Sequence, residues 1–454
     1  MYGKIKRIHF VGIGGIGMSG IAEVLINMGY EISGSDLGQS STVKRLKDLG
    51  AKISIGHSAK NVEGSGVVVI SSAIRADNPE VVRANELNIP VIPRAEMLAE
   101  LMRLRYGIAV AGSHGKTTTT SMVAAVLSYG KLDPTIVVGG KVKAMGTNAR
   151  LGRGKFMVVE ADESDGSFLR LSPVISVLTN IDEEHMDYYK DMAELESTFL
   201  EFLNKIPFYG LSVLCLDCPR VKALSKDFKK RIITYGFDKD AELRAENVEV
   251  SGFETNFNVI LNSTELGSIT LNVPGRHNAQ NALAAIAIGL ELGMSFDEVS
   301  KGLSEFRGID RRLQVKGEAR GITVVDDYAH HPKEIEVTLS ALKDSHDGRV
   351  VVIFQPHRYS RTKLLFDEFV EALSHTDMLY IMDIYAASED PVDGISSENL
   401  VQSISKKGQK NVHYLNGDKM LKTVVDNLKS DDLVITLGAG NVWAFGEKIV
   451  EEIR

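Results

Sequence analysis

The chain has 454 residues, of which 44% are apolar and 25% are charged, and this composition is typical of a globular protein of about three domains. Its formal net charge is −8, which disfavours nucleic acid as a partner. No apolar run approaches the ~20 residues that span a bilayer, and the first residues lack the apolar core of a signal peptide. We therefore expect a cytoplasmic protein without stable membrane association.

The first predicted unit opens with a strand and a glycine turn, HFVGIGGIGMSG, at residues 9–20. A turn of the form G-x-G-G-x-G before a helix brings main-chain N–H groups and a helix N-terminus to a bound diphosphate. Asp36 follows Gly17 at the distance of a ribose-binding carboxylate. Taken alone, this turn leaves a nicotinamide-dependent oxidoreductase open.

Further strand and helix patterns alternate through the first hundred residues. The apolar runs are short and look buried on both faces, which is typical of parallel sheets in α/β units. The predicted strands are residues 8–13, 31–36, 51–56 and 66–72, and the predicted helices are residues 79–88 and 95–104.

A second glycine turn, AGSHGKTTTT, is the more specific of the two. Gly112 and Gly115 allow a tight turn, Lys116 supplies a charge for β and γ phosphates, and Thr117 offers a hydroxyl to Mg²⁺. Val110 occupies the first glycine position of the strict P-loop, so this turn is a variant. A cation in the first turn of a helix is unfavourable unless an anion binds there. The sequence therefore predicts nucleotide binding.

Acidic residues follow the next buried strand, in FMVVEADESD. A carboxylate at the carboxyl end of a parallel strand shares the crevice of the phosphate turn, so we expect Glu160 to be a metal ligand. For residues 162–165 a solvated acidic loop is the alternative. After the next predicted strand, VLTNIDEEHMD places Asn180, Asp182 and His185 past the strand end. Because the GKT and VVE motifs are also present, His185 is expected to be a second magnesium-side ligand.

The remaining patterns complete three α/β units. Cys215 and Cys218 are predicted to lie at a strand end and turn, and residues 247–273 to form a small antiparallel insert. A last series of strands begins after residue 312. The predicted domains are residues 1–104, 105–311 and 312–454.

Six motifs in order carry a resemblance over the whole chain. They are GSHGKTTTT, VVEADESD, TNIDEEHMD, PGRHNAQNALAA, DDYAHHPKEI and QPHRYSRT, and together they resemble the Mur ligases of peptidoglycan synthesis. The resemblance implies a three-domain α/β fold: a Rossmann-like N-terminal domain for a UDP-sugar, a central P-loop-type ATPase domain with a mostly parallel sheet, and a Rossmann-like C-terminal domain for an amino acid. The first glycine turn is then expected to hold the diphosphate of the UDP-sugar.

Within that family, the resemblance implies ATP-dependent joining of L-alanine to the lactyl carboxylate of UDP-N-acetylmuramate, through an acyl phosphate. The implied cofactors are ATP and two Mg²⁺ ions. The protein is expected to be a monomer or weak homodimer. The nearest alternative is a recycling ligase, which attaches a whole tripeptide to the same sugar nucleotide. A nucleotide-sensing module and the oxidoreductase remain alternatives of other classes.

The expected site residues fall into five groups. The catalytic residues are Lys116, Glu160, His185 and Arg312, and Arg311 stays open as the alternative to Arg312. The expected ATP-binding residues are Gly112, Ser113, His114, Gly115, Lys116, Thr117, Thr118, Asn278 and Asn281. The expected UDP-sugar-binding residues are Gly14, Gly15, Ile16, Gly17, Met18, Ser19, Asp36 and Ser71. The expected metal ligands are Thr117, Glu160 and His185.

The last group would bind the amino acid. Arginine forks match carboxylates, so Arg358 and Arg361 are expected at the alanine carboxylate, with Tyr328 and His330 shaping a small pocket. A metal site at the neighbouring histidines is a minor alternative. For Asn278, N-capping of its helix is an alternative or an additional role.

Overall fold

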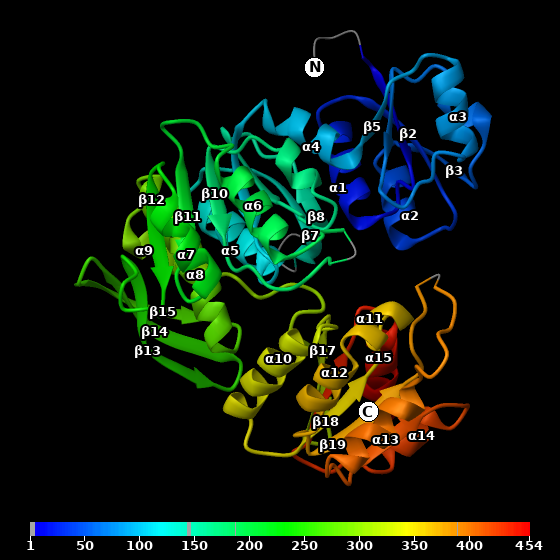
Figure 1. The fold of residues 1–454 in the computed structure, drawn as a ribbon, viewed down its shortest axis with the longest axis vertical. Helices are drawn as coiled ribbons and strands as arrows, with labels where there is room; N and C mark the ends of the chain where they lie inside the picture. The colour runs from blue at the N-terminus through cyan, green and yellow to red at the C-terminus, as the bar shows by residue number, and fades with distance from the viewer. Residues whose placement is uncertain (1–4, 143–146, 187, 388) are drawn as a thin grey trace. The chain divides into compact units, whose positions relative to one another are not determined.

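The computed structural model describes residues 5–142, 147–186, 188–387 and 389–454, which form three sheets covered by helices (Figure 1). Two compact units are present. One comprises Met1–Asn247, Phe257–Ile269 and Gln280–Phe306, and the other comprises Val248–Asn256, Thr270–Ala279 and Arg307–Arg454. None of the helices in the described ranges is long and apolar enough to cross a membrane.

The first sheet has the order β3-β2-β1-β4-β5, and its neighbouring strands are parallel. Its strands are β1 (Arg7–Val11), β2 (Glu31–Asp36), β3 (Lys52–Ile55), β4 (Val67–Ile70) and β5 (Val91–Pro93). Its helices are α1 (Ile16–Asn27), α2 (Ser41–Asp48), the 3-10 helix η1 (Ala59–Val62), α3 (Pro79–Glu86) and α4 (Arg94–Met102). Alternation along β1 places Ile8 and Phe10 in the core that includes Ile21 of α1, and leaves His9 on the opposite face.

The second sheet has the order β15-β14-β13-β12-β11-β10-β6-β9-β7-β8. Its first strands are β6 (Tyr106–Ala111), β7 (Thr135–Val142), β8 (Thr147–Arg150), β9 (Phe156–Glu160) and β10 (Ile175–Leu178). The others are β11 (Leu211–Cys215), β12 (Ile232–Gly236), β13 (Leu243–Ser251), β14 (Glu254–Leu261) and β15 (Thr264–Leu271). Neighbouring strands pair parallel in the series β9, β6, β10, β11 and β12. Strands β7 and β8 instead pair antiparallel. The prediction that this sheet is mostly parallel is therefore confirmed, whereas the antiparallel pairing of β7 with β8 was not predicted.

Helices lie between the strands of this sheet in the chain and, as α8 and α9, after its last strand. They are α5 (Lys116–Tyr129), the 3-10 helix η2 (Ser167–Arg170), α6 (Met192–Leu203), α7 (Pro219–Asp227), α8 (Arg276–Glu291) and α9 (Phe296–Ser304). Cys215 ends β11 and Cys218 precedes α7, and both cysteines are free. The strand-end and turn interpretation of the cysteine pair is therefore confirmed.

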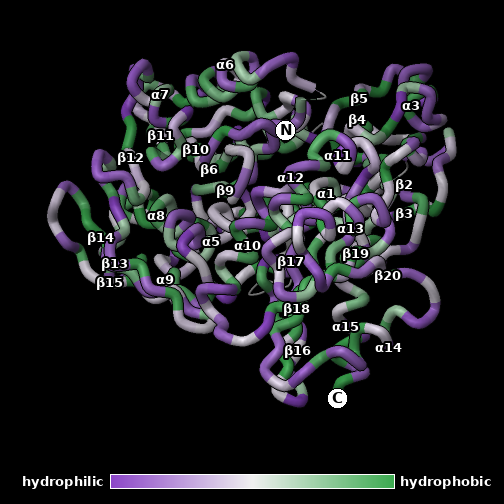
Figure 2. The backbone as a smooth tube through the Cα atoms, turned by 60° about the horizontal axis from the view of Figure 1, so that its bottom comes forward, coloured by the Kyte–Doolittle hydropathy of each residue, from purple (hydrophilic) through white to green (hydrophobic). Residues whose placement is uncertain are grey.

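The third sheet has the order β16-β17-β21-β18-β19-β20. Its strands are β16 (Gln314–Ala319), β17 (Ile322–Asp327), β18 (Val350–Phe354), β19 (Met378–Met382), β20 (Val412–Leu415) and β21 (Leu433–Leu437). Its helices are α10 (Pro332–Ser345), α11 (Tyr359–Leu364), α12 (Phe366–Leu373), α13 (Ser397–Lys406), α14 (Met420–Val425) and α15 (Val442–Ile453). Every residue of β18 is buried, and its apolar sequence is green in Figure 2. Only β16 pairs antiparallel here, at the edge beside β17, and the sequence did not predict it.

In these parallel sheets the carboxyl ends of neighbouring strands meet at one edge, where ligands of open α/β sheets bind. Both glycine turns start there, since one follows β1 and the other follows β6. The predicted domain limits at residues 104 and 311 remain predictions, while the three sheets occupy residues 7–93, 106–271 and 314–437.

Candidate active site

The second glycine turn is tightly packed. Gly112 has φ of 130°, and a Cβ there would lie 2.1 Å from Thr179 Oγ1. Gly115, at the N-cap of α5, is left-handed with φ of 80°. Both positions require glycine because a side chain would be strained and, at Gly112, would also collide with Thr179.

The loop after β10 holds this turn from the other side. Asn180 accepts the His114 amide with Oδ1 at 2.8 Å, and Ser113 Oγ accepts the Asp182 amide at 2.8 Å. His114 Nε2 lies 3.3 Å from Asp182 Oδ2. Asn180 and Asp182, predicted only to lie past a strand end, therefore fix the turn that follows β6.

Lys116 folds back over the turn. Its Nζ donates to the Gly112 carbonyl at 2.6 Å, to the Ser113 carbonyl at 3.0 Å and to Glu163 Oε1 at 2.8 Å. Burial by itself lowers the pKa of Lys116, but the nearby carboxylates, chiefly Glu163, outweigh burial and raise it. The ammonium therefore stays charged, as a group that neutralises phosphate must.

Thr117 and Glu160 form a second contact at the turn. The Thr117 hydroxyl lies 2.9 Å from Glu160 Oε1 and 3.0 Å from Oε2, and the Gly139 amide donates to Oε2 at 2.7 Å. A hydroxyl beside a carboxylate offers the hard oxygen ligands that Mg²⁺ prefers. The structure thus brings together two of the predicted metal ligands.

Glu163 is a functional candidate that the sequence analysis left in a solvated loop. That alternative is wrong for this residue, because its side chain is only 1% exposed. Burial raises the pKa of Glu163 to about 7, although Lys116 opposes the rise. Its Oε2 is buried and, among the described residues, has no hydrogen-bond partner.

The predicted ligand His185 lies in the same place. One ligand atom each of Glu163, Glu184 and His185 lies within 4.8 Å of the others, and His185 Nε2 is 3.8 Å from Glu163 Oε1. Two carboxylates and an imidazole, one carboxylate oxygen being buried without a partner, fit a divalent cation. The residues present therefore fit the magnesium that the sequence analysis expected here.

The two asparagines of α8 differ in their surroundings. Asn281 Oδ1 accepts from Thr119 Oγ1 at 3.2 Å, and a Cβ on Gly115 would lie 2.8 Å from it, so Asn281 lies against the turn. Asn278 donates to the Pro274 carbonyl at 2.7 Å and lies inside the helix, which begins at Arg276. The N-cap interpretation of Asn278 is therefore wrong, since a cap residue precedes the first helical residue.

At the first glycine turn, Asp36 holds the main chain. Its Oδ2 accepts the Gly14 amide at 2.8 Å, and a Cβ on Gly14 would lie 2.8 Å from the same oxygen. Ser71 lies beside the turn, since a Cβ on Gly12 would be 3.9 Å from Ser71 Oγ. Asp36 thus positions the loop, a role that the ribose hypothesis did not include.

The start of α1 has both exposed and buried predicted residues. Ile16 is 57% exposed, and Gly15 and Gly17 flank it at the helix N-terminus. Met18 and Ser19 are buried, and Ser19 Oγ donates to the Ile16 carbonyl at 3.0 Å. A ligand at this turn would therefore not meet the side chains of Met18 and Ser19, and the Ser19 amide already donates to the Gly15 carbonyl at 2.8 Å.

Aromatic rings meet at the carboxyl edge of the third sheet. The Tyr328 and His330 rings lie 5.2 Å apart, His330 and His357 lie 6.2 Å apart, and His357 stacks on Tyr385 at 5.5 Å. His357 Nδ1 is buried and, within the described ranges, has no hydrogen-bond partner. His357 lies in the motif QPHRYSRT but was given no role, and Tyr385 was missed because its only signal is its place after a strand.

Arginines adjoin this aromatic group. Burial, with the charges of Arg361, His330 and Arg358, lowers the pKa of His357 to about 4. Arg358 has φ of 70°, and its amide donates to the Tyr385 carbonyl at 2.9 Å. Neutral imidazole next to guanidinium groups gives a group of donors that suits a carboxylate.

Arg311 and Arg312 both lie over the Tyr328 ring, at 4.8 and 5.6 Å. Arg311 donates to Asp326 Oδ2 at 3.3 Å and to the Gly438 carbonyl at 2.5 Å, so its guanidinium is tied to the sheet edge. Arg312 lies 3.7 Å from Glu334 Oε1. Arg311 therefore has a structural role, and Arg312 stays the predicted arginine at the phosphates.

The parallel central sheet, the Lys-Thr turn and Glu160 define an α/β protein of the phosphate-turn nucleotide-binding class. Three family models match: "Mur ligase family, catalytic domain" at residues 7–106, "Mur ligase middle domain" at residues 110–289, and "Mur ligase, glutamate ligase domain" at residues 311–440. The chain belongs to the Mur ligase family.

Relatives of full length are similar to this chain. A protein of Geotalea uraniireducens named UDP-N-acetylmuramate–L-alanine ligase is 57% identical over 100% of this chain and 99% of the relative. One of Trichlorobacter lovleyi with the same name is 54% identical, with 100% of both chains covered. The crystal structure of a UDP-N-acetylmuramate–alanine ligase from Thermotoga maritima matches with a TM-score of 0.84, 30% identity and 98% of each chain covered.

Proposed function

We propose that this protein is an ATP-dependent ligase that joins L-alanine to the lactyl carboxylate of UDP-N-acetylmuramate in peptidoglycan precursor synthesis. The observation that carries the proposal is the Lys116, Thr117 and Glu160 arrangement at the second glycine turn, in a chain 57% identical to a ligase named for this reaction. A carboxylate and an amine do not condense in water unaided, so γ-phosphoryl transfer to the carboxylate first gives an acyl phosphate. The alanine amine then attacks its carbonyl, and phosphate leaves.

The residues of the second turn act by positioning and charge neutralisation. Lys116 balances the β and γ phosphate charge, and Asn281 would contact the adenine base of ATP. Thr117, Glu160 and His185 would hold Mg²⁺, proposed as two ions, which supplies further charge neutralisation when bound. Arg312 is the proposed additional cation at the phosphates.

The other two sites bind the reacting partners. Main-chain amides at the N-terminus of α1, in a turn that Asp36 holds, bind the sugar diphosphate. Arg358 and Arg361 bind the alanine carboxylate, and Tyr328 and His330 limit the size of the side chain. ATP and a UDP-sugar as substrates support a cytoplasmic location, and a monomer or weak homodimer stays our expectation.

Phosphate release in the presence of ATP, Mg²⁺ and UDP-N-acetylmuramate, with each amino acid in turn, tests the proposal. L-alanine should give the highest kcat/KM, with glycine and L-serine lower. Lys116→Ala should abolish turnover, whereas Lys229→Ala, an exposed lysine before the amino end of β12, should not change it. A higher kcat/KM for the tripeptide would instead establish the recycling activity.

An oxidoreductase is the alternative of another class. It has no use for a γ-phosphate cradle with Thr117 beside Glu160, so the second turn argues against it. Oxidation of a nicotinamide cofactor without ADP release would overturn the proposed function. Tight ATP binding without turnover under any acceptor would point to a nucleotide sensor.

A further inference from the structure

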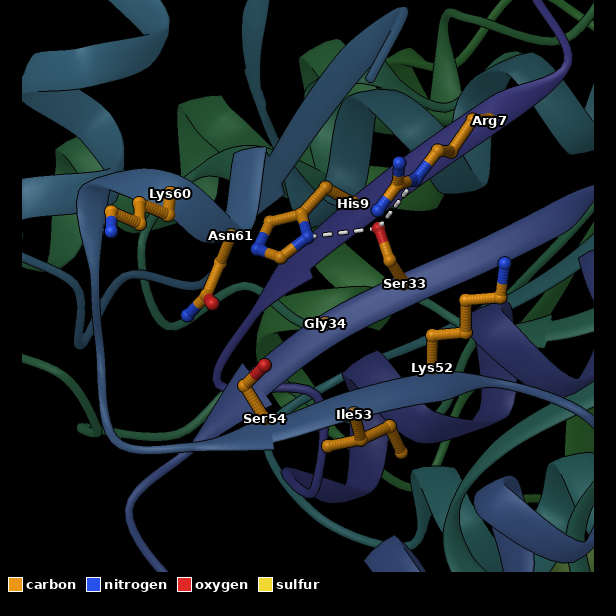
Figure 3. Close-up of a pocket in the computed structure, with 9 residues that line it drawn as sticks. All are labelled: Arg7, His9, Ser33, Gly34, Lys52, Ile53, Ser54, Lys60 and Asn61. Carbon is orange, nitrogen blue, oxygen red and sulfur yellow. Dashed lines mark hydrogen bonds between the residues drawn. The ribbon is translucent and has the colours of Figure 1, made fainter. Parts of the chain in front are cut away.

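A cavity of about 360 Å³ lies in the first sheet (Figure 3), within the size range of small-molecule sites. Its lining includes Arg7, His9, Ser33, Lys52, Lys60 and Asn61. Arg7 and Lys52 are the first residues of β1 and β3. The first glycine turn instead follows the carboxyl end of β1, so this cavity is separate from the proposed sugar-nucleotide site.

The strand register explains why these side chains share one cavity. His9 pairs with Ser33, and Ser33 pairs with Lys52, across three parallel strands. Side chains in register on neighbouring strands point to the same face. The 3-10 helix η1 adds Lys60 and Asn61 from the same side (Figure 3).

A buried chain of polar groups orients the arginine. Glu80 lies 3.5 Å from His9 Nε2, His9 Nδ1 lies 2.9 Å from Ser33 Oγ, and Ser33 Oγ accepts from Arg7 Nε at 3.4 Å. His9 is 1% exposed and Glu80 is fully buried. Arg7 is also held by the Glu63 carbonyl at 3.1 Å, so its guanidinium is fixed at the cavity wall.

The charges at the cavity are unbalanced. Within the ranges that the structure describes, Arg7, Lys52 and Lys60 form no ion pair with a carboxylate. Glu80, which contacts His9 and Asn61, offsets part of this charge, but three cations stand against this one carboxylate. Three cations around one cavity create a positive local potential that attracts an anion.

We propose that this cavity binds a small phosphorylated metabolite through its phosphoryl group. An amino acid fits less well, because the lining has no carboxylate for its ammonium group. The near absence of apolar lining disfavours ligands with large apolar surfaces. Arg7, Lys52 and Lys60 supply the charge, while Ser33 and Asn61 offer polar groups.

A crystal of the full chain soaked with inorganic pyrophosphate tests where the phosphoryl group binds. Density in contact with Arg7 and Lys52 is expected, in addition to any at the two glycine turns. Pyrophosphate at the glycine turns alone, or nowhere, would overturn the proposal. A parallel soak with ribose 5-phosphate distinguishes an inorganic from a sugar-linked phosphoryl source, and density at the cavity with either probe supports the site.

Calorimetry of matched double variants gives the second readout. Lys52→Gln with Lys60→Gln should weaken pyrophosphate binding to this site at least tenfold, since two charged hydrogen-bond donors are lost. Lys44→Gln with Lys47→Gln, on α2 of the same unit, makes the same charge change and should leave affinity unchanged. Equal affinity of the two double variants would refute the assignment. Titrations with a non-hydrolysable ATP analogue and the UDP-sugar present remove binding at the glycine turns.

Discussion

Lys116 Nζ lies 2.8 Å from Glu163 Oε1, and both side chains are largely withdrawn from solvent. Burial alone would lower the pKa of Lys116, and Glu163 is the first of the carboxylates that oppose this effect. Glu163 therefore keeps the lysine charged and places it over the turn before a nucleotide arrives. We infer that Glu163 is a positioning residue for Lys116.

Glu163→Gln tests this role. The pKa of Glu163 is raised to about 7, so the carboxylate is present above pH 7 and is protonated as the pH falls below it. In the wild type, kcat/KM for ATP should therefore decline below pH 7, and in Glu163→Gln this decline should disappear while the plateau falls about tenfold or more. The pH profile of phosphate release measures both effects.

Unfolding of the same variant provides the control. A neutral amide is easier to bury than a carboxylate whose pKa burial has raised, but Lys116 loses its hydrogen-bonded carboxylate, so Glu163→Gln should unfold at a moderately lower temperature at pH 8. An unaltered acid limb in the variant would contradict the positioning role, and a large drop in the unfolding temperature would attribute the lost activity to misfolding.

Thr117 offers a test with closely matched side chains. Thr117→Ser keeps the hydroxyl that contacts Glu160, whereas Thr117→Val keeps the shape and removes it. Thr117→Val should lower kcat by about 10²–10³-fold, the size seen when one electrostatic contact in a reactive site is lost, and weaken Mn²⁺ binding in the presence of ATP. Thr117→Ser should remain within several-fold of the wild type. Electron paramagnetic resonance of Mn²⁺ measures the metal directly, and equal Mn²⁺ affinity in both variants would exclude Thr117 as a ligand.

The sequence predicted local features well and long-range partners poorly. The glycine turns, Lys116, Thr117 and Glu160 follow from the spacing of neighbouring residues, and the mostly parallel sheets follow from short apolar runs. Glu163 is buried, and its main-chain carbonyl accepts from the hydroxyl of Tyr189, 26 residues further along the chain, a partner that nothing near residue 163 indicates.

The polar network under the first sheet shows the same limit. The sequence indicated no role for His9, which lies in an apolar predicted strand. Its partner Glu80 lies 71 residues further along the chain. Spacing rules describe neighbours on one helix or strand, so a pair brought together by tertiary packing leaves no local pattern. Tyr385, stacked on His357, was missed for the same reason.

Glu80 carries a prediction on stability. Burial alone would raise its pKa, but hydrogen bonds from His9, Ser35 and Asn61, with the Ser58 amide, lower it to about 2 from 4.5. The stabilisation is therefore present above pH 4.5 and is lost as the pH falls toward 2, and Glu80→Gln should cost about 3 kcal/mol at pH 7. Urea unfolding of both proteins from pH 7 to pH 3 should show a constant difference down to about pH 4.5 and a shrinking one below. A difference that grows on acidification would have the opposite sign to this linkage.

The proposed alanine pocket predicts a selective loss of affinity. Arg361→Ala should raise KM for L-alanine about 10–100-fold, because a charged hydrogen bond to its carboxylate is lost, and should leave KM for UDP-N-acetylmuramate nearly unchanged. Lys363→Ala changes an exposed cation on the same helix, α11, and should alter neither constant. Initial rates at varied alanine give the comparison, and a parallel rise in both KM values would argue against a specific carboxylate contact.

Arg311 and Arg312 should fail in different ways when each is changed to alanine. The side chain of Arg311 joins Asp326 to the Gly438 carbonyl, and Asp326 is fully buried. Removal of Arg311 leaves that carboxylate without its cation, so Arg311→Ala should lower the unfolding temperature by several degrees. Arg312 pairs with partly exposed Glu334 and interacts with buried Asp327, so Arg312→Ala should lower the unfolding temperature less than Arg311→Ala but lose kcat by at least tenfold. Thermal unfolding and phosphate release, measured on both variants, separate the structural arginine from the one that meets the phosphates. If Arg311→Ala were instead the stable, inactive protein, the two assignments would have to be exchanged.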